Sequence, residues 1–150
     1  MQTIEILNLT QHESSAEQKQ MNVVSLDSKF KMGLKDLLTF DEIPLSAFDV
    51  MGRAKILVNQ YVIPNFKGKY VMIGGASYLM HFLDIYLSKA GYIPVTAFTK
   101  RVSQEENGVK KSVFLHEGFI ISPIMEIDEW VFYVKNGIKK SFIISQLPIK

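Results

Sequence analysis

The sequence predicts an α/β domain built on a mixed, three-layer, Rossmann-like sheet, and three observations support this fold class. Residues 70–90 form a short apolar run, a diglycine and then a segment with apolar residues at helical spacing. Strand-like and helix-like segments alternate up to this point, which is typical of a parallel sheet. Two Asn-Gly pairs, at residues 107–108 and 136–137, lie between strand-like runs and predict antiparallel hairpins.

The composition fits one compact domain. The chain has 150 residues, 47% of them hydrophobic, which suffices for a sizeable core. Its 17 Lys and Arg against 15 Asp and Glu give a net charge of +2, too little to indicate a groove for duplex nucleic acid. The absence of cysteine excludes disulfides and thiolate metal sites. We find neither a leader-peptide pattern nor an apolar run of about 20 residues, so we expect a cytoplasmic protein that does not enter the membrane.

The predicted elements follow the order of the chain. Strands are expected near residues 3–8, 70–73, 93–103 and 110–121, and helices near residues 14–22, 45–62 and 77–90. A short strand near 23–26 and a helical turn near 32–38 complete the first half. The helix at 45–62 is expected to have an apolar face that includes Leu45, Phe48 and Met51. The continuous apolar run at 70–73 is expected inside the sheet rather than at its edge.

Polar residues follow the first strand, where its carboxyl end meets a loop: Asn8, Thr10, Gln11 and His12. Ligands of open parallel sheets bind outside these ends, so we expect this loop and the turn at Gly74-Gly75 to border one crevice. Backbone N–H groups of the turn, and of the helix that begins near Ser77, favour an anion such as phosphate there. The alternative is that the polar residues serve only as turn and capping residues.

The Asn107-Gly108 pair fixes the register of the first hairpin when its loop has two residues. In that register the facing pairs are Thr99 with His116, Arg101 with Phe114, Ser103 with Ser112, Glu105 with Lys110 and Glu106 with Val109. Alternation places Arg101, Ser103 and His116 on one face of the ribbon, away from the apolar valines. The alternative for Arg101 is an ordinary ion pair with Glu105.

Pro123 is the expected boundary between a domain of residues 1–122 and an extension of residues 123–150. The extension is predicted to form a hairpin whose apolar residues include Trp130 and Phe132, for which the first domain has little core left to cover. Because an isolated hairpin is marginal in water, we expect it to pack on the same domain or on a partner subunit. We therefore expect a homodimer.

The familiar catalytic signatures are absent from the sequence. No Walker A lysine follows the glycine turn, and residues 74–78 lack the spacing of a nucleophile elbow. His12, His81 and His116 have no metal-ligand spacing, so we expect neither a metal nor a cofactor.

Five segments carry a resemblance to known proteins: Asn8 to His12, Leu38 to Pro44, Met72 to Met80, Ala97 to Ser103 and Phe114 to Phe119. Together they resemble a group of small uncharacterised bacterial proteins that open with Asn-Leu-Thr-Gln-His, over about residues 1–120. More distantly, the first motif with Glu17-Gln18 and the Rossmann-like plan resemble small stand-alone CRISPR-associated proteins related to CARF domains. This second resemblance implies binding of cyclic oligoadenylate second messengers and, in some members, their cleavage without a metal.

Three functions remain open. The first is a nucleotide-binding module that senses or sequesters a cyclic oligonucleotide, with its phosphate at the glycine turn and a charge-assisted contact from Arg101. The second is a metal-independent phosphodiesterase, a ring nuclease, in which Arg101, Ser103 and His116 position the reacting groups, stabilise charge and transfer a proton. The third is a structural or interaction protein without a small ligand.

Overall fold

The computed structural model describes residues 3–122 and 129–143. The strands are β1 (Ile6–Leu9), β2 (Val23–Ser25), β3 (Tyr70–Ile73), β4 (Ile93–Glu106), β5 (Val109–Ile121), β6 (Glu129–Lys135) and β7 (Ile138–Ile143). The helical segments are α1 (Ala16–Gln20), η1 (Ser28–Phe30), α2 (Lys31–Leu38), α3 (Ala47–Ile56), η2 (Leu57–Val62), α4 (Ile63–Asn65) and α5 (Ser77–Lys89). None of the helices in the described residues is long and apolar enough to cross a membrane.

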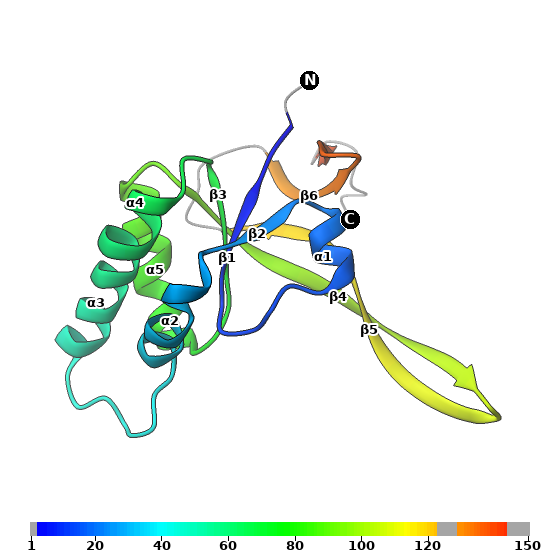
Figure 1. The fold of residues 1–150 in the computed structure, drawn as a ribbon, viewed down its shortest axis with the longest axis horizontal. Helices are drawn as coiled ribbons and strands as arrows, with labels where there is room; N and C mark the ends of the chain where they lie inside the picture. The colour runs from blue at the N-terminus through cyan, green and yellow to red at the C-terminus, as the bar shows by residue number, and fades with distance from the viewer. Residues whose placement is uncertain (1–2, 123–128, 144–150) are drawn as a thin grey trace, which may run out of the picture.

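The strands of the described residues form one seven-stranded sheet with the order β2-β1-β3-β4-β5-β6-β7 (Figure 1). β2, β1, β3 and β4 run parallel, and each later pair is antiparallel. The prediction of an α/β fold with a mixed sheet is confirmed. β3 lies between β1 and β4, so the apolar run at 70–73 is inside the sheet, and the helix predicted at 77–90 is present as α5.

α2, α3 and α5 lie on one face of the parallel strands (Figure 1). Leu7 and Val71 point from the strands into this core, where they join Leu57, Leu79 and Leu83 of the helical segments. All five side chains are at most 1% exposed. β1 and β3 are buried along their whole length because helices cover one face and further strands cover the other.

The second face is covered by α1 and by the sheet itself, which curls. Ile6 and Met72 share an apolar core with Phe119 of β5 and Phe132 of β6. The curl brings the turn between β6 and β7 to the segment before β1, where the N–H of Ile4 donates to the carbonyl of residue 137 at 3.1 Å. In the described part of the extension, β6 therefore packs against the chain's own core, and the expectation that Phe132 has little core left to cover is wrong.

The boundary residue Pro123 lies outside the described residues. Trp130, which lies at the irregularity in the pairing of β6 with β7, is 41% exposed, so of the two aromatic residues only Phe132 is fully buried.

The helix predicted at 45–62 differs from the expectation in two ways. It begins at Ala47, capped by the hydroxyl of Ser46, and changes from α- to π-helical geometry at Leu57. Leu45 and Phe48 are 93% and 79% exposed, so their expected place on a buried face is wrong. The start of α3 and the loop before it extend past the sheet (Figure 1), and within the first turn of the helix Val50 is the residue that reaches the core.

β4 and β5 continue well past the sheet as a two-stranded arm (Figure 1). Every pair predicted from the Asn-Gly turn is present in the register. Asn107 and Gly108 have φ angles of 54° and 76°, as the two-residue hairpin turn requires. The arm reaches roughly 25 Å beyond Thr99, at about 3.3 Å a residue.

Candidate functional site at the carboxyl edge of the sheet

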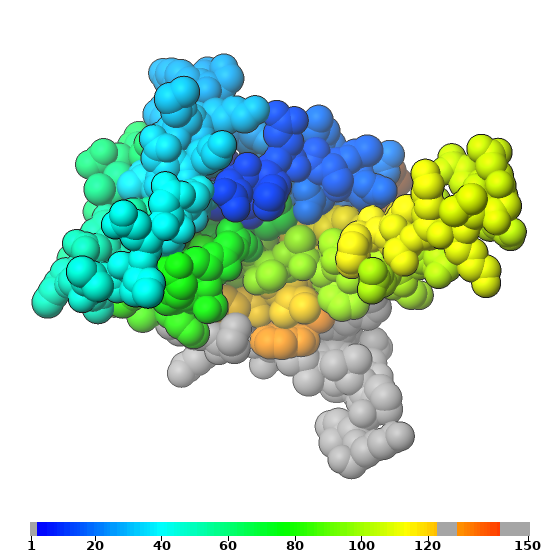
Figure 2. Space-filling view, turned by 90° about the horizontal axis from the view of Figure 1, so that it is seen from below, coloured from blue at the N-terminus to red at the C-terminus, as the bar shows by residue number. Residues whose placement is uncertain are grey.

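Three chain segments meet at the carboxyl edge of the parallel strands. Leu9 at the end of β1 is level with Ile73 at the end of β3, so the loop after β1 and the turn after β3 are neighbours. A Cβ built on Gly74 would lie 3.5 Å from Cγ2 of Thr10, which shows how closely they approach. Figure 2 views this edge from below, with the blue loop, the green start of α5 and the yellow-green base of the arm side by side.

Asn8 holds the loop after β1 in shape. Its side-chain amide donates to the carbonyl of His12 at 2.9 Å and to Oγ of Ser14 at 3.0 Å. Its Oδ1 accepts hydrogen bonds from the backbone N–H and the hydroxyl of Thr10, at 3.0 and 2.6 Å. Asn8 is buried, so these bonds satisfy both ends of its amide. Asn8 and Thr10 thus use their polar groups to build the loop.

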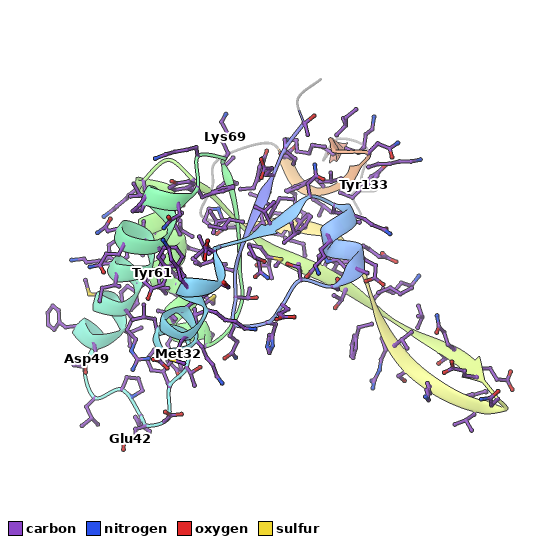
Figure 3. The ribbon with its side chains drawn as sticks, viewed as in Figure 1. Met32, Glu42, Asp49, Tyr61, Lys69 and Tyr133 are labelled. Carbon is purple, nitrogen blue, oxygen red and sulfur yellow. The ribbon has the colours of Figure 1, made fainter. Side chains whose placement is uncertain are left out.

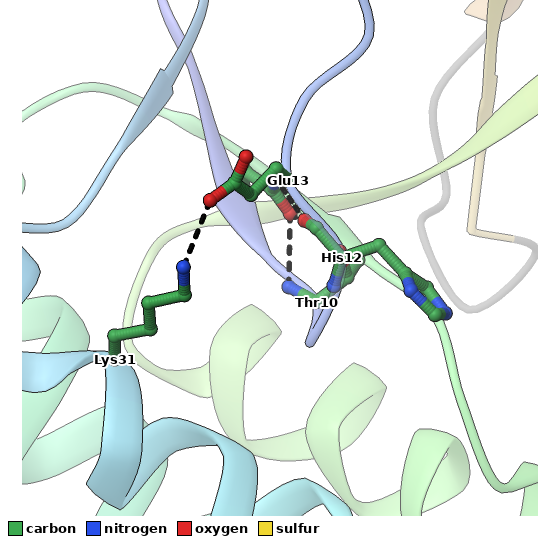
Figure 4. Close-up of polar contacts among 5 residues, drawn as sticks. Thr10, His12, Glu13 and Lys31 are labelled. Carbon is green, nitrogen blue, oxygen red and sulfur yellow. Dashed lines mark hydrogen bonds and ion pairs between the residues drawn. The ribbon is translucent and has the colours of Figure 1, made fainter.

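Gln11 and His12 lie on the exposed part of the same loop. Oε1 of Gln11 accepts a hydrogen bond from the hydroxyl of Thr39 at 3.1 Å, which joins the loop to the segment after α2. The imidazole of His12 points away from the ion pair between Glu13 and Lys31 (Figure 4). That pair has an N–O distance of 2.8 Å, and the hydrogen bond from Lys31 lowers the pKa of Glu13.

The turn after β3 leaves the start of α5 without a side-chain cap. Ala76 is the N-cap residue and makes no side-chain hydrogen bond, while the exposed Ser77 is the first helical residue. Gly75 has a φ of 143°, a conformation that residues with a Cβ rarely adopt. The turn therefore directs the N-terminus of a 13-residue helix to the carboxyl edge, and such a terminus favours an anion.

Two aromatic rings that the sequence reasoning did not assign to a site lie beside this turn. Tyr78, 44% exposed, packs edge-on against Phe40 with ring centres 5.0 Å apart. The guanidinium of Arg53 lies 4.1 Å from the centre of the Phe40 ring and donates to the carbonyl of Thr39 at 2.7 Å. Arg53 thereby fixes Phe40 against Tyr78. The one feature of the sequence that could have indicated this part of the site is the aromatic residue directly after Ser77.

A hollow of about 1000 Å³ opens on the far side of Phe40, between α2 and α3. Carboxylates dominate its charged lining: Asp36, Asp41, Glu42 and Asp49, against Lys35 and Arg53. Figure 3 shows Glu42 and Asp49 at this end of the molecule. The excess of negative charge disfavours phosphate in this hollow.

A second hollow, of about 950 Å³, lies at the opposite, amino edge of the sheet. Its lining includes Lys67, Lys69 and Lys139. Nζ of Lys139 is held by Glu129 at 2.7 Å and by the hydroxyl of Tyr70 at 2.9 Å, so this lysine has a structural role.

The structure places Arg101, Ser103 and His116 on one face of the arm but does not gather them. His116 is level with Thr99, and about 13 Å of strand separates that level from Ser103. The guanidinium of Arg101 lies 5.6 Å from the centre of the Phe114 ring. No ion pair joins Arg101 to Glu105 in the described part of the chain.

His116 is the buried member of this set. Its ring packs edge-on against Phe119 with centres 4.8 Å apart, and neither ring nitrogen has a hydrogen-bond partner among the described residues. Burial lowers the pKa of His116, while the charge of Glu17 on α1 acts in the opposite direction. The ring is therefore neutral at neutral pH. Across residues 3–122 and 129–143, no group of three His, Asp or Glu side chains could hold a metal ion.

The fold and this edge define an α/β protein with a parallel core, in which a polar loop and a glycine turn lie together at the open carboxyl edge. Residues 4–120 match the family described as the Uncharacterized protein MJ1673 family, and the chain belongs to it. The match ends within β5, before the hairpin of β6 and β7. Comparisons with curated proteins and with solved structures gave no match.

Proposed function

We propose that this protein is a nucleotide-binding module that senses or sequesters a cyclic oligonucleotide, with a phosphate bound at the Gly74-Gly75 turn. The strand order carries the proposal. β1 lies between β2 and β3, so the chain leaves β1 on one side to form β2 and later adds β3 on the other side. Open parallel sheets bind ligands at the carboxyl end of such a switch point. Here the switch point is where the polar loop meets the glycine turn.

A Rossmann-like, three-layer plan is part of the proposal. α1 follows β1 on one face of the parallel strands, and α2, α3 and α5 lie on the other, which is the arrangement of doubly wound folds. The resemblance of the first motif to CARF-related proteins favours a cyclic oligoadenylate as the ligand. A cytoplasmic location belongs to the same proposal.

The groups at the edge suit the parts of a nucleotide. The N–H groups of the α5 terminus and the hydroxyl of Ser77 can donate to a phosphate. The exposed ring of Tyr78 offers a face on which a base can stack. Arg101 lies about 13 Å along β4 from the level of the glycine turn, a separation that suits a ligand with more than one phosphate.

Calorimetric titration with cyclic oligoadenylates, cyclic AMP and AMP, with and without EDTA, tests the proposal. We expect a cyclic oligonucleotide to bind in both buffers, and chromatography afterwards to recover it intact. Failure of every nucleotide to bind would refute the proposal and favour a structural role. Recovery of a cleaved product in EDTA would instead identify a metal-independent phosphodiesterase.

The variant Ser77→Glu separates binding from folding. A carboxylate in the first turn of α5 is favourable for the helix, so the melting temperature should hold or rise. The same charge repels a phosphate at the turn, and we expect affinity to fall at least about tenfold, or about 1.4 kcal/mol. Gln60→Glu is the matched control, since it adds the same charge at an exposed position of η2 and should leave affinity unchanged. An unchanged affinity in Ser77→Glu would contradict the assignment of phosphate to this turn.

A further inference from the structure

The arm of β4 and β5 is a two-stranded ribbon with both edges bare. β3 pairs with β4 only as far as Val95, and β6 pairs with β5 only at Phe119 and Ile120. Among the described residues, no strand lies against the arm between Thr99 and Leu115. Figures 1 and 2 show the arm standing clear of the rest of the molecule.

A two-stranded ribbon of this kind is not stable by itself. Two strands alone are marginal in water, and a bare strand edge presents a row of unpaired backbone N–H and C=O groups. Phe114 is 65% exposed and Val109 is 59% exposed on this ribbon, so apolar surface is exposed as well. The arm therefore has the character of a pairing surface.

The charges along the outer edge of β4 are self-complementary. The sequence from residue 100 to 106 is Lys-Arg-Val-Ser-Gln-Glu-Glu, with two cations at the base and two carboxylates at the tip. Reversing this strand about Ser103 places Lys100 at the level of Glu106 and Arg101 at the level of Glu105. A second copy of the same strand, running antiparallel, thus meets opposite charge at each of these positions.

We propose that the arm pairs with the arm of a second copy of this chain, β4 against β4, about a two-fold axis at Ser103. Lys100 then faces Glu106 of the partner subunit, and Arg101 faces Glu105 of the partner subunit, each contact occurring twice by symmetry. The two ribbons become one four-stranded sheet in the order β5-β4-β4-β5. A sheet of three or more strands can be stable in water, whereas an isolated two-stranded ribbon is marginal, so the pairing would stabilise both arms.

The outer edge of β5 does not offer the same match. From residue 109 to 116 it reads Val-Lys-Lys-Ser-Val-Phe-Leu-His, which contains cations and no carboxylate. An antiparallel pair of these edges gains no opposite charges. Within the arm, the Nζ of Lys111 already lies 3.6 Å from the carboxylate of Glu106, so the β5 lysines support the tip from their own side. β4 is therefore the pairing edge.

The pairing also brings the partner to the candidate site. In the register centred on Ser103, Asn107 of the partner subunit falls level with Thr99, at the base of the arm. Continuing the pairing of β3 with β4, Thr99 lies two residues past the level of Gly74. The tip of each arm would thus form a wall beside the glycine turn of the other subunit. The inference itself does not depend on what that turn binds.

Charge reversal on the full chain tests the pairing, with oligomeric state read by sedimentation equilibrium without nucleotide. The wild-type chain should have twice the mass of the monomer at micromolar concentration. The double variant K100E/R101E makes all four facing positions acidic, and E105K/E106K makes all four basic. We expect each to sediment at half the wild-type mass, with an unchanged far-ultraviolet circular dichroism spectrum.

An equimolar mixture of the two variants shows whether the charge reversals prevent pairing through repulsion or instead damage the fold of the arm. In a mixed pair every facing position again carries opposite charges, so native mass spectrometry should show the heterodimer. K135E/K140E is the matched control, since it changes the net charge by the same amount at two exposed positions of the β6–β7 hairpin, away from the arm, and should stay dimeric. A monomeric wild type, a dimeric K100E/R101E or a mixture that stays monomeric would each overturn the proposal. A monomer that binds a short DNA duplex through the arm would also overturn it and would assign the arm to nucleic acid.

Discussion

His116 lies at the base of the arm, buried against Phe119, and its two ring nitrogens have no protein partner in the part of the chain that the structure describes. A buried imidazole without hydrogen bonds is tolerated only while it is neutral, because protonation would place an uncompensated charge in an apolar setting. The residue therefore couples the fold of the arm's base to pH.

The coupling has a definite sign. Burial lowers the pKa of His116 below 6.5 in the folded protein, so below pH 6.5 the unfolded chain binds a proton that the folded chain does not. The contribution of His116 to the free energy of unfolding should be constant above pH 6.5. As the pH falls toward the folded pKa, that contribution should decrease by up to about 1.4 kcal/mol per pH unit. Urea titrations from pH 7 to about pH 5 should show this loss in the wild type and a smaller one in His116→Leu. Equal pH dependence in the two proteins would show that His116 titrates normally.

The candidate site was only partly predictable at the scale of single residues. Asn8 and Gly74 were expected at one edge because each follows a recognisable buried strand, and the structure places them there. The hydrogen-bond partners of the loop were not predictable, because the path of the loops brings Ser14 to Asn8 and Thr39 to Gln11. Tyr78 went unassigned because its neighbour Phe40 is fixed by Arg53, which is far from both in the sequence.

At the scale of elements, local signals were the reliable ones. The Asn107-Gly108 turn fixed the whole register of the arm because a two-residue loop leaves no freedom to slip. The apolar period at 45–62 predicted a helix correctly but placed Leu45 and Phe48 on its buried face. Periodicity defines a stripe along a helix and says nothing of how far the neighbouring layer extends beneath it.

Substitutions at two glycines test the close contact between β5 and β6. A Cβ built on Gly118 would lie 2.6 Å from the carbonyl oxygen of Phe132, a backbone atom that cannot move aside without disturbing β6. We expect Gly118→Ala to lower the free energy of unfolding by about 1–3 kcal/mol. Gly52→Ala is the matched change in α3, where a Cβ would meet no described atom within 4 Å apart from its own helical backbone and adjacent residues, and it should raise stability by about 0.5–1 kcal/mol. Thermal or urea unfolding of the two variants gives the comparison, and a stable Gly118→Ala would contradict the close contact of β5 with β6.

The whole molecule depends on a contact that the sequence did not reveal. The strands after the arm return over the second face of the parallel sheet, so that Phe132 completes the core around Met72 and Phe119. Sequence pattern indicated a hairpin there but not its place, because the curl depends on packing between segments about 60 residues apart in the chain. The same curl leaves the carboxyl edge of the sheet uncovered, with the arm rising beside it (Figure 2).

The proposed binding of a nucleotide at this carboxyl edge is tested most directly by amide chemical shifts, measured by NMR on the isotope-labelled protein. On titration with a cyclic oligoadenylate, we predict that the largest shifts fall in residues 10–14 and 74–78, on the two segments that meet at the switch point. The basic hollow at the amino edge is the internal comparison, with Lys67 and Lys69 as its reporters. Largest shifts at those lysines, or no shift anywhere at saturating nucleotide, would contradict binding at the carboxyl edge.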